Sequence, residues 1–164
     1  ATMTIDGDAR VPGSVRVLQP GSAHPAVVQV GPERRDTAVR KLCMKIPDAH
    51  GPGRDQDFLM ASSADGALLH HAVLPADSVA SLYSSLWLYL AGLQPVLFGV
   101  LASTTGRDLR FGYGDELSFA ISPPAGQFRR IGALVLTGPG DAAVRFSGRN
   151  SGGNIWPLPP VSFY

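Results

Sequence analysis

Glycine and proline divide this chain into short apolar segments, and this division limits what the chain can fold into. The 164 residues include 19 glycines and 14 prolines, which place turns at short intervals along the sequence. Frequent turns favour short strands over long helices. The length suits one domain, residues 1–164, with its own core.

Strands are predicted on both sides of the middle of the chain. The segments before the middle cover residues 13–21, 24–32, 37–47, 57–62 and 66–75. The segments after it cover residues 108–124, 127–140, 141–148 and 158–164. In the segment 37–47, side chains alternate between two faces, so Arg40, Leu42, Met44 and Ile46 share a face that is apolar except at Arg40.

The middle of the chain has a different hydrophobic period. Apolar residues recur there at helical spacing, at Val79, Leu82, Tyr83, Leu86, Trp87 and Leu90. Asp77 or Ser78 suits an N-cap and Gly92 suits a helix end, and residues 95–102 are expected to continue as a second short helix. We therefore expect a mainly β (α+β) fold, an antiparallel β-barrel with one central helical insertion. The interior of such a barrel often holds a ligand.

Composition excludes several classes of function. Charged residues make up only 16% of the chain and the net charge is +1, which argues against a nucleic-acid partner. The most apolar stretch, Leu86–Leu101, is too short and too interrupted to span a bilayer. No integral membrane protein is expected, and this stretch is instead a candidate homo-oligomer interface.

Cysteine content and the N-terminus add two further expectations. The single cysteine, Cys43, excludes an internal disulfide and a cysteine-based zinc finger. The polar start of the chain is no signal peptide as it stands, although a cleaved signal would leave no trace. The sequence thus favours a cytoplasmic location.

Three segments together resemble the catalase-like superfamily, in its smaller catalase-related branch. They are "HPAVVQVGP…RRD", "VRKLCMKIPDAHGPGRDQDFLMAS" and "LRFGYGDELSFAISPP", and the closing "FRRIGALVLTGPGDAAVRFSG…PLPPVSFY" is similar to the last barrel strands of that family. Order and approximate spacing hold over most of the chain. The resemblance implies an antiparallel barrel of the catalase or lipocalin type, a haem and peroxide chemistry.

The haem positions that the resemblance implies are mostly missing. The family's axial tyrosine usually follows an arginine by four residues, and no such pair occurs here. The first histidine, His24, comes one strand too late for the distal histidine, and "ASSADG" stands where the distal asparagine is expected. Only Arg40 matches, at the position that meets a haem propionate. The fold is therefore expected without the cofactor, since folds do not fix function.

Arg40 and Asp57 are the first candidate site residues. Arg40 is able to hold a ligand carboxylate or phosphate by its bidentate fork, beside Met44 on the same face. The alternative is an ion pair of Arg40 with Asp57 or with another acid, which would hold two neighbouring strands together, and this structural interpretation is favoured. Asp57 is also a candidate catalytic residue.

Further candidates are two histidines and three aromatic residues. His70 and His71 point to opposite faces of a strand, so they cannot chelate one metal together, but either is a candidate general acid or base. A histidine that lies on the surface or is hydrogen-bonded within the fold is the favoured alternative. Tyr113 is a further catalytic candidate, in a Gly-rich turn with Asp115 and Glu116. A simple turn is the favoured interpretation there, and an acid at the barrel mouth that acts as a base is the alternative. Trp87 and Tyr89 are candidates to line a pocket, with core packing as the favoured alternative. No metal site is predicted, because His50 and the aspartates near it match no known metal-site spacing.

Three functions remain open from the sequence. The first is a haem-free barrel that binds an apolar small molecule in its cavity, and that acts as a cyclase or isomerase by positioning its substrate. The second is a haem peroxidase or oxygenase with an unusual ligand. The third is a non-catalytic interaction module that uses the Leu86–Leu101 stretch.

Overall fold

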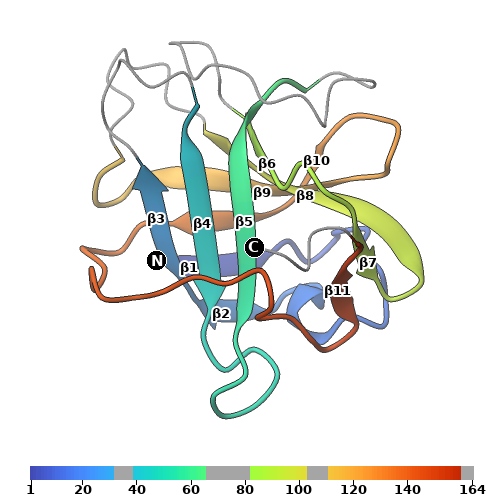
Figure 1. Cartoon of the computed structure of the whole chain (residues 1–164), viewed down its shortest axis with the longest axis horizontal. Coiled ribbons are helices and arrows are strands. Elements are labelled where there is room, and N and C mark those ends of the chain that lie inside the picture. Colours follow the sequence, from blue (N-terminus) through green and yellow to red (C-terminus); the bar gives the residue numbers. More distant parts are fainter. Residues whose placement is uncertain (32–38, 66–81, 103–110, 160–164) are drawn as a thin grey trace.

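The computed structural model describes residues 1–31, 39–65, 82–102 and 111–159. Within these residues the protein is almost entirely β-structure, with one short 3-10 helix, η1 (Arg16–Leu18) (Figure 1). The strands are β1 (Thr2–Ile5), β2 (Ala23–Pro25), β3 (Val27–Gly31), β4 (Lys41–Ile46), β5 (Gln56–Ser63), β6 (Leu82–Ser84), β7 (Tyr89–Ala91), β8 (Gln94–Ala102), β9 (Glu116–Ser122), β10 (Arg129–Val135) and β11 (Ile155–Pro157).

The strands form a nearly closed antiparallel barrel. Their order is β2-β1-β10-β9-β8-β6-β5-β4-β3, so the two ends of the sheet are consecutive strands. Only Ala26 separates β2 from β3, and its N–H donates to the carbonyl of Ala1 at 2.8 Å. The chain thus passes from β2, which pairs with β1, to β3, which pairs with β4, across a single residue. This connection curls the sheet toward closure.

A small sheet extends from one end of the long strand β8. Residues Gly99–Leu101 of β8 pair with β6, while Gln94–Val96 pair with β7, and β7 in turn pairs with β11. Gly92, with a φ of 62°, makes the turn between β7 and β8. Residues Ser85–Leu88 form the loop that connects β6 of the barrel to β7 of this small sheet.

Aromatic rings fill the centre of the described interior. The ring of Phe58 lies 4.7 Å from that of Phe98, 5.7 Å from that of Phe119 and 5.9 Å from that of Tyr89, measured between centroids. Aromatic pairs at these separations gain stability beyond the area that they bury. On the opposite face of β8, Leu97 packs with Leu82, Ala120 and Phe128 in a second, smaller cluster.

The predicted central helix is wrong over residues 82–102, which form β6, β7 and β8. Both faces of β8 are covered, one by the main core and the other by the second cluster. A strand buried on both faces is apolar throughout and does not alternate. Such a run cannot be distinguished from a buried helix by its period alone. The proposed N-cap residues, Asp77 and Ser78, lie outside the described residues.

Most of the predicted strands are confirmed. Segments 24–32, 37–47, 57–62, 108–124 and 127–140 overlap β2 and β3, β4, β5, β9 and β10 respectively. The segment 13–21 holds η1 in place of a strand, and residues 141–148 form turns. The segment 66–75 and most of 158–164 lie outside the described residues. The predicted shared face of the segment 37–47 is also confirmed, since Arg40, Leu42, Met44 and Ile46 are all buried.

Candidate binding groove

The outer face of β4 and β5 carries a groove, whose floor follows directly from strand alternation. Leu42 and Met44 point into the barrel, so Lys41 and Cys43 point outward. Lys41 pairs with Ala61, and Cys43 pairs with Leu59. Four outward side chains of modest size thus form a mostly apolar floor with one cation at its edge.

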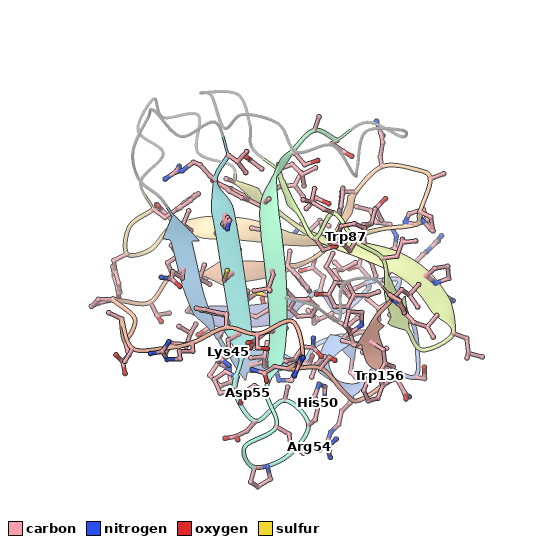
Figure 2. All side chains as sticks on the ribbon, in the orientation of Figure 1. Lys45, His50, Arg54, Asp55, Trp87 and Trp156 are labelled. Atoms are coloured by element: carbon pink, nitrogen blue, oxygen red, sulfur yellow. The ribbon has the colours of Figure 1, made fainter. Side chains whose placement is uncertain are left out.

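The loop after β6 forms one wall of the groove. The Ser84 hydroxyl accepts a hydrogen bond from the N–H of Leu86, which has a φ of 60°. The Ser85 hydroxyl donates to the carbonyl of Trp87 at 2.8 Å and accepts from the N–H of Phe98. These bonds hold the loop in shape, and Trp87, which is 40% exposed and labelled in Figure 2, lines the groove together with Leu59 and Ala61 of β5.

The groove has a volume of about 410 Å³, within the usual range for small-molecule sites. Carbon-rich side chains dominate its lining. The residues that line it are Val39, Lys41, Cys43, Leu59, Met60, Ala61, Ser85, Leu86, Trp87, Tyr89 and Gly148. An apolar molecule of moderate size fits such a surface better than a polar one does.

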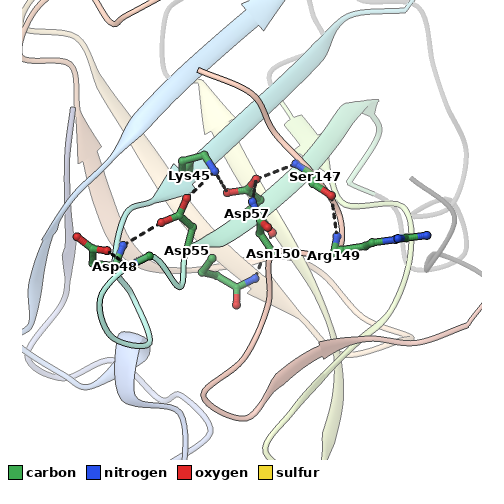
Figure 3. Close-up of polar contacts among 9 residues, drawn as sticks. Lys45, Asp48, Asp55, Asp57, Ser147, Arg149 and Asn150 are labelled. Atoms are coloured by element: carbon green, nitrogen blue, oxygen red, sulfur yellow. Dashed lines mark hydrogen bonds and ion pairs between the residues drawn. The ribbon is translucent and has the colours of Figure 1, made fainter. Parts of the chain in front are cut away.

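Residues 141–150, here called the strap, form the end of the groove at Gly148. The strap crosses the outer face of β4 and β5 (Figure 1). It is tied down by Asp57, whose Oδ2 accepts hydrogen bonds from the Ser147 N–H at 2.8 Å and the Asn150 side-chain amide at 2.9 Å (Figure 3). The backbone N–H of Asp57 also donates to the carbonyl of Asn150.

Lys45 neutralises this buried carboxylate. Its Nζ lies 3.1 Å from Asp57 Oδ1, as an ion pair without hydrogen-bond alignment, and 2.8 Å from Asp55 Oδ2. Burial lowers the pKa of Lys45, but the hydrogen bond to Asp55 and the ion pair with Asp57 together outweigh burial and raise that pKa overall. The hydrogen bond from Lys45 holds the pKa of Asp55 below its usual value.

Two titratable groups in the groove are held in their neutral forms. Burial raises the pKa of the Cys43 thiol, although the nearby charge of Lys41 opposes that rise. Burial, supported by the charge of Asp57, raises the pKa of Tyr89 to about 12. Both groups are therefore protonated and uncharged at neutral pH.

The structure brings together only some of the predicted site residues. Trp87 and Tyr89, both predicted to line a pocket, do line the groove. Met44 and Arg40 face the barrel interior, on the other side of the sheet. Tyr113 is 84% exposed, in a turn where Asp115 accepts a hydrogen bond from Gly112 N–H. His70 and His71 lie outside the described residues.

The predicted pair between Arg40 and Asp57 is wrong. Asp57 lies opposite Lys45 in the β4–β5 register, whereas the carbonyl of Arg40 accepts a hydrogen bond from Ser62 N–H near the other end of β5. Arg40 and Asp57 also belong to opposite faces of the sheet. The Arg40 N–H donates to the Ser62 hydroxyl, and the Arg40 guanidinium opposes the rise in Tyr83 pKa that burial causes.

Sequence reasoning missed the partners of Asp57. Ser147 and Asn150 lie 90 and 93 residues further along the chain, so no local spacing could indicate the contact. The side of the sheet on which Lys45 lies was predictable, because strand alternation places Lys45 on the same face as Cys43. The β4–β5 register that sets Lys45 opposite Asp57 depends on the loop between them, whose shape the sequence did not reveal.

The described interior fits a haem poorly. The rings of Phe58, Phe98 and Phe119 contact one another at the centre of the barrel, so no flat macrocycle fits between them. Among the residues that the structure describes, no three His, Cys, Asp or Glu side chains gather as metal ligands.

No helix in the described ranges is long and apolar enough to cross a membrane.

Comparison with known proteins gives no relative. No family model, no curated protein and no solved structure matches this chain.

Proposed function

We propose that this protein binds a small apolar molecule carrying an acidic group, and that it does so in the groove on the outer face of β4 and β5. The observation that carries this proposal is the groove itself, a mostly apolar hollow of about 410 Å³ with a lysine at its edge. The sequence favoured an apolar ligand inside the barrel. The aromatic packing of the described interior makes the outer groove the better site.

The two ends of such a ligand would meet different surfaces. Its apolar part would lie on Leu59 and Ala61 and against the indole of Trp87, where contact removes apolar area from water. Its acidic group would lie at Lys41, an exposed ammonium that acts as a point charge. A medium-chain fatty acid has this division of properties and serves as a probe.

The groove chemistry supports binding more than acid–base catalysis. Cys43 and Tyr89 are protonated at neutral pH, because burial raises both of their pKa values. The Ser85 hydroxyl is already engaged with the Trp87 carbonyl and the Phe98 N–H. A cyclase or isomerase that only orients its substrate stays the second candidate, favoured by the apolar lining.

Two other expectations stay predictions. Membership of the catalase-like superfamily rests on the sequence resemblance alone. A homo-oligomer through Leu86–Leu101 draws support from Leu93, which is 92% exposed, and from Trp87, while Val96–Val100 are buried within the barrel wall.

Tryptophan fluorescence tests the proposed function. The chain has two tryptophans, so Trp156→Phe leaves Trp87 as the single reporter at the groove. Decanoate is expected to change its emission with saturation. Lys41→Gln should weaken decanoate binding by about three- to fivefold, the upper part of the range for one exposed ion pair, and should leave binding of neutral decanol unchanged.

The matched control is Arg129→Gln, which removes an exposed positive charge from β10. It is expected to leave the affinity for decanoate as it is. Absence of any saturable response to decanoate or decanol would refute the proposal. An equal loss of decanoate affinity in Lys41→Gln and Arg129→Gln would refute the role of Lys41.

A further inference from the structure

We propose that Asp57 is a positioning residue for the groove: it fixes the strap at Gly148 and so sets the length of ligand that the groove accepts. This inference rests on the proposed function. It assigns to Asp57 a role away from the ligand, since Asp57 is buried beneath the strap and is absent from the groove lining.

The strap forms a tight turn where Asp57 holds it. The Asn150 N–H donates to the carbonyl of Ser147 at 3.0 Å, and the Arg149 N–H donates to the Ser147 hydroxyl. Gly148 and Arg149 are therefore the tip of a turn that begins at Ser147 and ends at Asn150. Asp57 binds both of these outer residues through one carboxylate oxygen (Figure 3), so the tip has little freedom to move.

A buried carboxylate needs such partners. Asp57 is 1% exposed, and a charge in that environment is stable only when it is paired and hydrogen-bonded. Lys45 supplies the charge, and its ammonium also lies 5.9 Å from the centroid of the Phe146 ring on the strap. The strap is thus held by a cation–π contact as well as by the carboxylate.

The position of Asp57 on β5 connects the strap to the groove. Asp57, Leu59 and Ala61 follow one another at every second residue, so all three lie in a row on the outer face. The row is open over Leu59 and Ala61, which line the groove, and covered over Asp57, where the strap crosses. Release of the strap would expose about 7 Å more of this row, the length of two strand residues.

The test is the chain-length preference of Asp57→Asn. Fatty acids from octanoate to tetradecanoate, each below its critical micelle concentration, are titrated into the wild type and the variant. The wild type is expected to bind the shorter acids best, because Gly148 ends the groove. In Asp57→Asn the preference for tetradecanoate over decanoate should rise by about tenfold.

Trypsin reports independently on the strap, which contains Arg145 and Arg149. Cleavage at these sites should be faster in Asp57→Asn than in the wild type. Asn150→Ala removes one of the two hydrogen bonds that the Asp57 carboxylate accepts from the strap. It keeps the ion pair between Asp57 and Lys45. It should shift the length preference in the same direction but less, and it keeps the test open if Asp57→Asn does not fold.

Asp6→Asn is the matched control, since it removes the carboxylate of another ion pair, with Arg130, on the barrel surface. It should change neither the cleavage at the strap nor the length preference. A strap that trypsin cleaves faster while the length preference stays as in the wild type would overturn this inference and leave the proposed function intact. Absence of fatty-acid binding by the wild type would overturn the proposed function itself.

Discussion

Burial decides the protonation state of the phenol at the base of the groove. Tyr89 is 2% exposed and contacts the rings of Phe58 and Phe98. Its phenolate would lie in an apolar environment near the carboxylate of Asp57, so the neutral form is strongly favoured and the pKa rises to about 12. The same residue thus belongs to the core and to the groove lining.

Tyr89→Phe should reduce the loss of stability at high pH. Below pH 10.0, the pKa of tyrosine in the unfolded chain, the phenol is protonated in both the folded and the unfolded state. Between pH 10.0 and the folded-state pKa of about 12, only the unfolded state ionises. Between pH 9 and pH 11 the free energy of unfolding should therefore fall by about 1 kcal/mol more in the wild type than in the variant. Urea unfolding at the two pH values measures this difference, and equal losses in the two proteins would contradict it.

The direction of side chains along single strands was predictable from the sequence. Alternation alone placed Arg40 on the same face as Met44, and the structure buries both. The partner of Asp57 was not predictable, because an ion pair across β4 and β5 requires their register. The result is that Asp57 pairs with Lys45 on the outer face, and its expected role changes from catalysis to support of the strap.

At the scale of the elements, a bulge in β10 brings two strands into close backbone contact. The β9–β10 register shifts between Arg130 and Gly132, and Gly132 lies opposite Ile5 of β1. A Cβ atom at Gly132 would overlap the backbone carbonyl of Thr4. Since a backbone atom within a paired strand cannot rotate away as a side chain can, only glycine fits this position.

Gly132→Ala should therefore destabilise the protein by about 2–3 kcal/mol, near the upper end of the usual cost of overpacking. Gly7→Ala is the control, because a Cβ at Gly7 would meet no atom within 4 Å. The midpoints of urea unfolding compare the two variants with the wild type. A loss in Gly132→Ala no larger than that in Gly7→Ala would show that β1 and β10 are less tightly joined than described.

The error in predicting elements has a physical cause. The expected helix overlaps β6, β7 and β8, where packing on both sides of the sheet removes the alternation that identifies a strand. The segment 13–21 failed for a different reason: it packs Val15, Val17 and Leu18 into the core around a single 3-10 turn. Three apolar residues alone do not distinguish such a turn from a strand. Elements with one buried face, such as β4, were predicted well.

At the scale of the whole molecule, the barrel was predictable and the site was not. Frequent turns and short apolar segments indicate an antiparallel barrel, and the described strands form one. The groove joins segments that are far apart in the sequence: β4 and β5, the loop at Ser85–Trp87, and the strap. No short motif spans these segments, so only the folded chain shows that they share a surface.

The most direct test of the central claim, that an apolar acid binds in the outer groove, is an NMR measurement of contacts between decanoate and the uniformly labelled protein. Intermolecular NOEs are predicted from the ligand methylenes to the Trp87 indole, the Leu59 methyl groups and the Ala61 methyl group. NOEs to the interior rings of Phe58 and Phe98 in place of these, or none at saturating decanoate, would contradict the claim.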